Sequence, residues 1–179
     1  MQLSSQVIKL AVLALTRHGV SLALRIRDRF PGAVCHVPAR HRFAVAMGAV
    51  GFERIGEALS RVWGEVDGLV CVMATGIVVR HVAPLLEHKT TDPAVVVLDE
   101  QGHYVISLLS GHLGGANELA REVAAVTGGQ AVITTASDVR GRPALDLIAR
   151  EKGLEMENLE FLSRTARSIL EDESFWVFD

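Results

Sequence analysis

The segment Ser110–Asn117, with the sequence SGHLGGAN, holds the residues of this chain best suited to catalysis. Its glycines let the backbone approach a ligand closely, and it connects an expected strand to an expected helix, whose first N–H groups favour an anion. His112 is the natural general base, because an unperturbed imidazole has a pKa of about 6.5. Close packing of the helix explains Gly114 and Gly115 equally well.

Three further loops contain threonine and glycine at positions where expected strands end. They cover residues 16–19, 74–76 and 134–142. In open α/β sheets, ligands gather at the carboxyl ends of parallel strands, where loops and helix N-termini converge. We therefore expect these loops and the segment 110–117 to face one common ligand site.

Several common catalytic patterns do not occur in the sequence. The phosphate-binding signatures G-x-G-x-x-G and G-x-x-x-x-G-K-[ST] are missing, as is the G-x-S-x-G turn of serine hydrolases. Ser110 and His112 stand two residues apart at an expected turn, a spacing that disfavours a nucleophile and its base. The seven histidines are scattered and the cysteines are not paired, so no resident metal site is expected.

The composition is that of a folded protein, with 49% hydrophobic and 22% charged residues and a net charge of -3. The slight acidity and an aromatic content of 5% argue against a nucleic-acid partner. The apolar run Val7–Leu15 is too short to span a bilayer and lacks the flanks of a signal peptide, so no membrane partner is expected. Cys35 and Cys71 each lie in an apolar run, which favours reduced, buried thiols in a cytoplasmic protein.

Apolar runs of strand length alternate with amphipathic helical patterns over the first 134 residues. The expected strands cover residues 6–15, 33–37, 67–73, 94–99, 103–109 and 131–134, and the expected helices cover 20–30, 52–63, 77–86 and a segment ending near Thr127. This alternation is typical of a parallel α/β fold. The connection Glu100–Gly102 is short enough to require a β-hairpin, so we expect a mixed, mostly parallel sheet.

The last forty residues differ from the rest of the chain. Residues 135–143 form a polar, turn-rich stretch, after which Pro143 opens an expected helix. Beyond Gly153 the sequence is more acidic, and Phe175–Phe178 has the pattern of a strand. We expect an α/β domain over residues 1–140, and the start of a linker region over 141–179 that stops before a further domain.

Four blocks of the sequence together form a specific set of motifs. They are Met73–Arg80 (MATGIVVR), Lys89–Val97 (KTTDPAVVV), Leu108–Ala120 (LLSGHLGGANELA) and Ile133–Asp138 (ITTASD). In order and spacing they resemble the N-terminal half of the cobalamin biosynthesis protein CbiG family, over roughly residues 5–160.

The resemblance implies a cobalt-precorrin-5A hydrolase of the anaerobic route to cobalamin. In that reaction a δ-lactone between the ring A acetate and a methylated meso carbon is opened, and this carbon leaves with its methyl group as acetaldehyde, giving cobalt-precorrin-5B. The resemblance further implies a three-layer α/β/α domain and a CobE-like C-terminal domain, in cis or in trans. The cobalt would be carried by the corrinoid substrate, and no other cofactor is implied.

Lactone opening needs a base that activates water and donors that stabilise the developing oxyanion. We expect His112 to be the base and Asp138 to be a second acid or base. Asn117 or Glu118, at the start of the following helix, would orient the imidazole.

The remaining expectations concern binding of the oxyanion and of the carboxylates around the macrocycle. The glycine N–H groups of the segment 110–117 would hold the oxyanion, and the two arginines are suited to bidentate pairing with carboxylates. The residues expected to bind substrate are Thr75, Gly76, Arg80, Ser110, Gly111, Gly114, Gly115, Asn117, Thr134, Thr135 and Arg140.

Three other functions are compatible with the sequence. The chain could be a non-catalytic module that binds corrinoid intermediates, with the chemistry in the C-terminal domain. A nucleotide-binding α/β domain is disfavoured by the missing phosphate signatures. A purely structural role would leave the glycines and small polar residues at strand ends unexplained.

Overall fold

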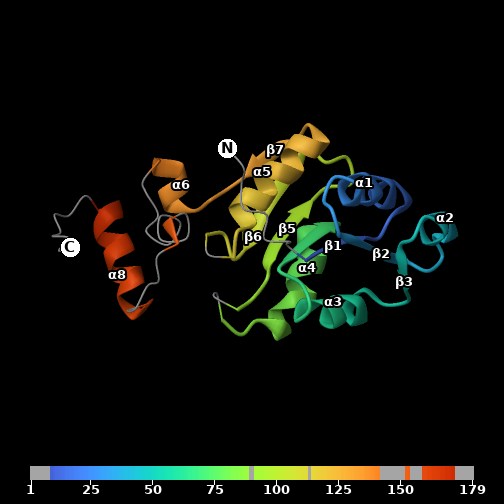
Figure 1. Cartoon of the computed structure of the whole chain (residues 1–179), viewed down its shortest axis with the longest axis horizontal. Helices are drawn as coiled ribbons and strands as arrows, with labels where there is room; N and C mark the ends of the chain where they lie inside the picture. The colour runs from blue at the N-terminus through green and yellow to red at the C-terminus, as the bar shows by residue number, and fades with distance from the viewer. Residues whose placement is uncertain (1–8, 89–90, 113, 142–151, 154–158, 172–179) are drawn as a thin grey trace. The chain divides into compact units, whose positions relative to one another are not determined.

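Seven strands form one sheet in the order β3-β2-β1-β4-β5-β6-β7 in the computed structural model of the chain (Figure 1). The structure describes residues 9–88, 91–112, 114–141, 152–153 and 159–171. The strands are β1 Leu10–Ala14, β2 Val34–Pro38, β3 Val50–Phe52, β4 Gly68–Val72, β5 Ala94–Leu98, β6 Tyr104–Leu109 and β7 Gln130–Val132. The helices are α1 Arg17–Arg27, α2 Arg42–Ala46, α3 Ile55–Trp63, α4 Thr75–Val82, α5 Ala116–Thr127, α6 Ala136–Arg140 and α8 Leu159–Leu170, with a 3-10 turn η1 at Ala83–Leu85.

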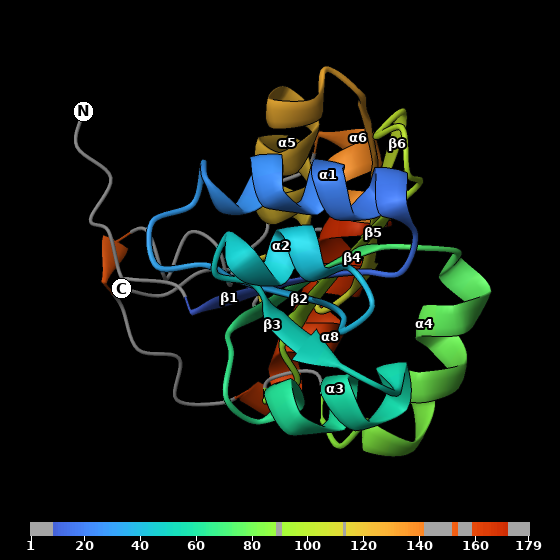
Figure 2. The same ribbon diagram turned by 90° about the vertical axis from the view of Figure 1, so that its right-hand side faces the viewer.

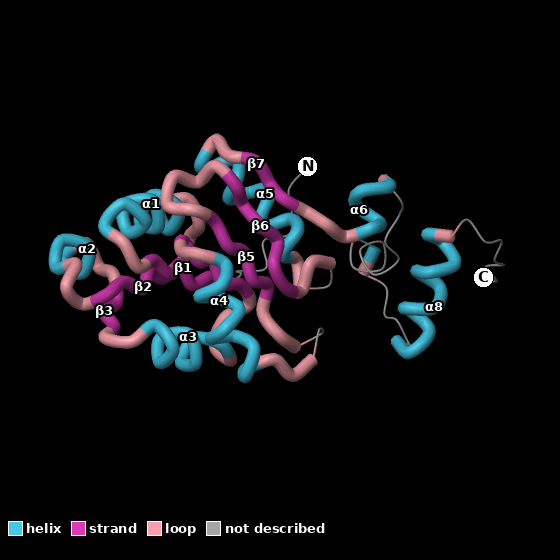
Figure 3. The backbone as a smooth tube through the Cα atoms, turned by 180° about the vertical axis from the view of Figure 1, so that it is seen from behind, coloured by secondary structure: helices cyan, strands magenta, loops and turns pink. Residues whose placement is uncertain are grey.

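The sheet contains two strand directions. Strands β1 to β5 are all parallel to one another, whereas β6 pairs antiparallel with β5 through the expected hairpin. Strand β7 pairs parallel with β6 and so also runs opposite to the first five strands. Figure 3 shows the strands in magenta, with β3 at one end of the sheet and β7 at the other. The prediction of a mixed, mostly parallel α/β sheet is confirmed.

Helices cover both faces of the sheet. Helices α1 and α5 pack on one face and contribute Ile26 and Val123 to its core, while α3 and α4 pack on the other with Leu59 and Val78. Figure 2 shows α1 and α3 on opposite sides of the strands. Because parallel strands covered on both faces bury every side chain, they are continuously apolar rather than alternating, as the sequence of β1 illustrates.

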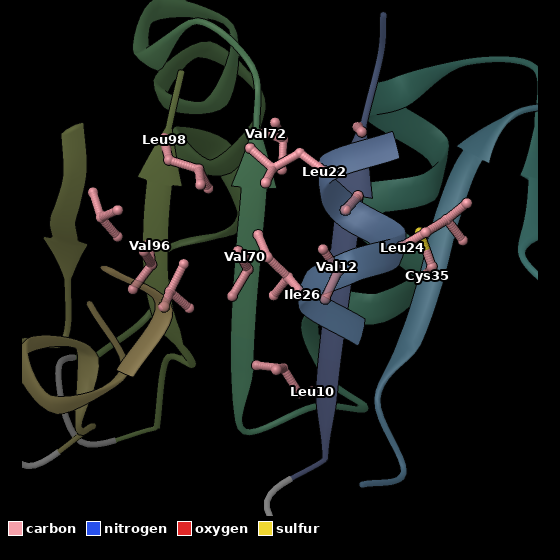
Figure 4. Close-up of a cluster of buried hydrophobic side chains, with 14 of the residues drawn as sticks. Leu10, Val12, Leu22, Leu24, Ile26, Cys35, Val70, Val72, Val96 and Leu98 are labelled. Atoms are coloured by element: carbon pink, nitrogen blue, oxygen red, sulfur yellow. The ribbon is translucent and has the colours of Figure 1, made fainter. Parts of the chain in front are cut away.

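The side chains of β1 divide between two cores. Leu10, Val12 and Ala14 belong to the core beneath α1, and Ala11 and Leu13 belong to the core beneath α3. Figure 4 shows the first of these cores, in which α1 residues including Leu22 and Ile26 lie over β1 and β4. Full burial of one such leucine or valine contributes roughly 1.5–3 kcal/mol, so these alternating contacts hold the loops at the strand ends in place.

Two elements and one loop differ from the prediction. Helix α2 and strand β3 lie in a stretch expected to be a loop and the start of a helix, because three residues are too few to show a strand pattern. Their positions depend on β2, where His36 pairs with Val50. The stretch expected to be a polar loop after residue 135 contains the short helix α6. The helix expected from Pro143 and the strand expected at 175–178 lie outside the described residues.

The chain divides into two compact units, residues 1–132 and 133–179. The first contains the whole sheet with α1 to α5. In the second unit, Nη1 of Arg140 donates to the carbonyl of Leu170 at 2.6 Å, which joins α6 to the end of α8. The expected domain boundary at residue 140 remains a prediction.

Candidate functional site

Strand direction divides the predicted site residues between two opposite edges of the sheet. We call the edge where β1 to β5 end the carboxyl edge, and the edge where they begin the amino edge. Val72, shortly before Thr75, pairs with Leu98 at the end of β5, whereas Leu109, before Ser110, pairs with Val95 near its start. Since a strand rises about 3.3 Å per residue, the two edges lie roughly 13 Å apart along β5.

The expectation that all four loops share one edge is therefore wrong. Residues 16–19 and 74–76 lie at the carboxyl edge, while the loop 110–115, which we call the glycine loop, lies at the amino edge. The β5–β6 hairpin is the physical reason, because it reverses the chain before the glycine-rich segment begins. Strand β7 also runs toward the amino edge.

The glycine loop is closed by hydrogen bonds onto the start of α5. The N–H of Ala116 donates to the carbonyl of Ser110 at 3.1 Å, and that of Asn117 donates to Gly111 at 3.0 Å. The N–H of Gly115 donates to the carbonyl of His112 at 2.9 Å, so it does not point at an oxyanion as expected. This leaves the N–H groups of Gly111 and Gly114 as the candidates for that role.

Close packing explains two of the loop's glycines. A Cβ on Gly114 would overlap the side chain of Ser110 and lie 2.8 Å from its carbonyl oxygen. A Cβ on Gly111 would lie 2.9 Å from Oδ1 of Asn117. Ser110 itself has a φ of 58°, the left-handed region that L-residues other than glycine adopt at a cost. The loop is thus held in a strained, tightly packed conformation.

Asn117 is the central anchor of the glycine loop. Its side chain is 4% exposed, and its Oδ1 accepts a hydrogen bond of 2.7 Å from Oγ of Ser107. The Ser110 hydroxyl donates to the carbonyl of Asp92 at 3.1 Å, and the Asp92 carboxylate accepts the N–H of Glu87. These contacts of Ser107 with Asn117 and of Asp92 with Ser110 were not anticipated from the sequence, although Asp92 lies in one of the four motif blocks.

The two other predicted catalytic residues of the first unit differ in exposure. His112 is half-buried in the glycine loop. Glu118 is exposed and forms an ion pair of 3.2 Å with Arg121, itself exposed. Of the two residues expected to orient the imidazole, only Asn117 is buried in contact with the loop.

The predicted binding residues at the carboxyl edge lie at the start of α4. Thr75 is half-buried at the first position of that helix, and Gly76 and Arg80 are exposed. No heavy atom lies within 4 Å of a Cβ placed on Gly76, so packing does not require this glycine. Nearby on the same edge, the hydroxyl of Thr16 donates to Glu100 at 2.6 Å and joins β1 to the hairpin.

A hollow at the carboxyl edge was not anticipated from the sequence. It has a volume of about 510 Å³ and lies where β1, β2 and β3 end. Its lining residues are Leu15, Pro38, Arg40, Phe52, Glu53, Arg54, Ile55, Gly56, Glu57 and His81. Recognition of β3 would have placed residues 53–57 at a strand end, but its three residues were expected to be a loop and the first residue of a helix.

The other predicted residues belong to the second unit. Thr134 is exposed, Thr135 precedes the first turn of α6, and Asp138 is half-buried within α6. Arg140 is exposed and donates to the Leu170 carbonyl, so part of its guanidinium already has a structural partner. Their predicted roles remain predictions.

The cysteines are buried thiols, as expected. Burial raises the pKa of Cys35 to about 11 and that of Cys71 to about 12, so neither is a thiolate near neutral pH.

Within the described ranges, no three histidine, cysteine or acidic side chains gather as potential metal ligands. None of the helices in the described part of the chain has the length and apolar character to cross a bilayer.

Comparison with known proteins identifies relatives of this architecture. The family model "Cobalamin synthesis G N-terminal" matches residues 57–138. A cobalt-precorrin-5A hydrolase of Priestia megaterium is 37% identical over 175 residues, covering 93% of this chain and 46% of the relative. One from Salmonella typhimurium is 40% identical over 162 residues, covering 90% of this chain and 45% of the relative.

The fold has a counterpart among solved structures. A crystal structure of a cobalamin biosynthesis protein G homolog from Sulfolobus solfataricus superposes with a TM-score of 0.57 at 24% identity. The match covers 96% of this chain and 49% of that one. The chain spans about half the length of the curated relatives it matches.

Proposed function

Residues 57–138 belong to the N-terminal family of cobalamin synthesis G proteins, and from this premise we propose that the chain is the N-terminal part of a cobalt-precorrin-5A hydrolase. The observation that carries the proposal is 37–40% identity to two such hydrolases over at least 90% of this chain. The substrate would be a cobalt-corrinoid intermediate of anaerobic cobalamin biosynthesis, with cobalt bound in the substrate.

In the proposed reaction, water opens the ring A δ-lactone. The water oxygen bonds to the acyl carbon, the acyl–oxygen bond breaks, and the product carries a free carboxylate. The oxygen released onto the methylated meso carbon becomes the carbonyl oxygen of acetaldehyde as the bond from that carbon to the macrocycle breaks. The macrocycle keeps the electron pair of this bond and takes up a proton, which gives cobalt-precorrin-5B.

The glycine loop offers groups suited to the first step. His112 is half-buried and would accept a proton from the attacking water. The N–H groups of Gly111 and Gly114 would stabilise the oxyanion, since those of Gly115, Ala116 and Asn117 are already bonded within the loop and the α5 start. Hydrogen bonds that fix the loop support this role, because preorganised donors are most effective.

Other predicted residues outside the glycine loop would also take part. Asp138 is proposed as a second acid or base, contributed by the second unit. Thr75, Gly76 and Arg80 would bind peripheral carboxylates at the carboxyl edge, away from the glycine loop. A substrate that uses both edges would have to extend around the sheet or bind with a further domain.

A direct assay tests the proposal. The chain is incubated with cobalt-precorrin-5A, alone and with the separately produced remainder of the Salmonella typhimurium relative, and acetaldehyde is measured. His112→Ala should lower turnover by about 100-fold or more, as expected for loss of a general base. The control His103→Ala changes an exposed histidine outside the glycine loop and should leave turnover within twofold. Unchanged turnover in a folded His112→Ala protein would remove His112 from the mechanism.

The second candidate function is a non-catalytic module that binds cobalt-corrinoid intermediates. The observation that favours it is that the chain spans about half of its hydrolase relatives. The same assay separates the two functions when the N-terminal chain carries His112→Ala and the remainder is present. A module would support full turnover despite this substitution, whereas a catalytic N-terminal part would not.

A further inference from the structure

The hollow at the carboxyl edge combines an apolar floor with a charged rim. Leu15, Pro38 and Phe52, the last two buried, come from the ends of three neighbouring strands. Arg40 and Arg54 belong to the rim. A cavity with this division fits a ligand that has both an apolar body and an anionic end.

Arg40 is held toward the hollow by the end of β1. Its Nη2 donates to the carbonyl of Leu15 at 3.1 Å, and Nε2 of His41 lies 3.1 Å from the same oxygen. A guanidinium has five N–H donors in a fixed plane, so a single bond to Leu15 fixes its orientation and leaves donors for a carboxylate.

The first turn of α3 forms a second part of the rim. Arg54 precedes this helix without a side-chain cap, and Ile55, Gly56 and Glu57 line the hollow. The first N–H groups of a helix have no partner within the helix and carry partial positive charge. They therefore add to the preference for an anion that the arginines create.

Gly56 allows a histidine to complete the rim. A Cβ at this position would lie 3.0 Å from Nδ1 and 3.3 Å from Cε1 of His81, so the glycine lets the imidazole of α4 approach α3. Glycine near the start of a helix is unfavourable relative to alanine, and this contact gives it a reason. His81 thus joins Arg40 and Arg54 around one cavity.

Acidic residues limit which anions the hollow can accept. Glu53 and Glu57 also line it, and Nη1 of Arg54 lies 3.5 Å from Oε1 of Glu57 with both side chains exposed. Such a long, exposed ion pair contributes little to stability, so Arg54 can exchange Glu57 for a ligand carboxylate. Nearby carboxylates repel a densely charged polyphosphate more than a single carboxylate on an apolar arm.

We propose that this hollow is a subsite for a carboxylate-bearing side chain of a tetrapyrrole, with the methylene arm on the apolar floor and the carboxylate on Arg40 and Arg54. The choice of a tetrapyrrole rests on the proposed function, whereas the preference for an organic carboxylate rests on the hollow itself. The subsite lies at the opposite edge of the sheet from the glycine loop, so it positions substrate and takes no part in bond breaking.

Uroporphyrin, a tetrapyrrole with acetate and propionate side chains, provides the test. The full chain is labelled with ¹⁵N, and amide shifts are followed during titration while porphyrin fluorescence gives Kd. We expect saturable shifts at Ile55, Gly56 and Glu57. The double variant Arg40→Gln/Arg54→Gln should weaken binding by about tenfold or more, the size expected for charge-assisted hydrogen bonds.

Arg61→Gln is the matched control, because Arg61 is an exposed arginine of α3, the helix that follows Arg54, and does not line the hollow. It should change Kd by less than twofold. Shifts confined to other parts of the chain, or equal effects of the double variant and the control, would overturn the subsite. Displacement of uroporphyrin by inorganic phosphate at equimolar concentration would also contradict it, since phosphate cannot use the apolar floor.

The test also separates this inference from the proposed function. If uroporphyrin binds in the hollow but the reconstituted protein releases no acetaldehyde, the subsite stands and the hydrolase proposal fails. If acetaldehyde is released at the same rate and KM by the wild-type protein and the double variant, the hydrolase proposal stands and the subsite fails.

Discussion

The amino and carboxyl edges of the same sheet are built in opposite ways. At the amino edge, backbone hydrogen bonds from Gly115, Ala116 and Asn117 close the glycine loop, and Gly114 and Gly111 pack against Ser110 and Asn117. At the carboxyl edge, nothing lies within 4 Å of a Cβ placed on Gly76, and Arg40 and Arg54 are among the residues that line a hollow of about 510 Å³. The comparison shows that packing requires Gly111 and Gly114 at the amino edge, whereas it does not require Gly76 at the carboxyl edge.

The two edges also suit different tasks in catalysis. A loop fixed by short hydrogen bonds can hold a base and donors in one geometry, which is what stabilisation of a transition state requires. An exposed rim of long arginine side chains suits recognition of flexible carboxylates. Substitutions at matched positions on the two edges test this division.

The largest expected effect comes from Gly114→Ala. The new Cβ would overlap Ser110, whose backbone is already at a positive φ, so we expect a loss of about 3 kcal/mol in the free energy of unfolding. Gly76→Ala is the control and should change stability by less than about 0.5 kcal/mol, because its Cβ meets nothing. Urea denaturation measures both. Equal effects would remove the contrast between the edges.

Asn117→Ala should have the next largest effect. It leaves the Ser107 hydroxyl without its buried acceptor and opens space beneath Gly111, at a cost of about 2 kcal/mol. Ser107→Ala should cost less, and the double variant should cost less than the sum of the two. A double-mutant cycle by thermal unfolding measures this coupling, and strict additivity would show that the two residues act independently.

Gly56→Ala should destabilise the protein by about 1 kcal/mol, because its Cβ presses on the His81 imidazole. In a His81→Ala background the same substitution should become neutral or stabilising, since only the helix preference for alanine remains. Chemical denaturation of the unchanged protein, the two single variants and the double variant tests whether the effect of Gly56→Ala changes sign. Persistence of the full loss without the imidazole would mean that another contact requires the glycine.

The smallest effect is expected for Glu118→Gln. Exposed ion pairs such as that between Glu118 and Arg121 contribute about 0.5 kcal/mol or less. Both stability and acetaldehyde release should therefore stay close to those of the unchanged protein. A tenfold loss of turnover with normal stability would instead assign Glu118 a direct part in the reaction at the amino edge.

Much of the fold was predictable because it depends on local patterns. Continuous apolar runs identified β1, β4 and β5, and the length of the Glu100–Gly102 connection required the antiparallel pair. Strand β3 escaped prediction because its three residues are stabilised by pairing with β2 and not by their own pattern. The hollow was not predicted either, because part of it is formed by the end of β3.

The site was predictable only in part. The sequence identified the glycine loop and His112, and it offered close packing as one explanation of the glycines, which the contacts of Gly111 and Gly114 support. It placed the loops at residues 74–76 and 110–117 on one edge, although the expected hairpin already implied that the strand before residue 110 runs opposite to the strand before residue 74. The sequence also did not show that the Gly115 N–H donates to the carbonyl of His112 within the loop.

The sequence by itself determined the α/β class, the hairpin, the buried cysteines and the resemblance to the CbiG family, since each follows from residue type and spacing along the chain. Only the tertiary structure decided which loops meet. Sheet pairing brings together residues far apart in the chain, such as Arg40 with Leu15. Those positions are set by non-local hydrogen bonds and core packing, for which neighbouring residues carry no signal.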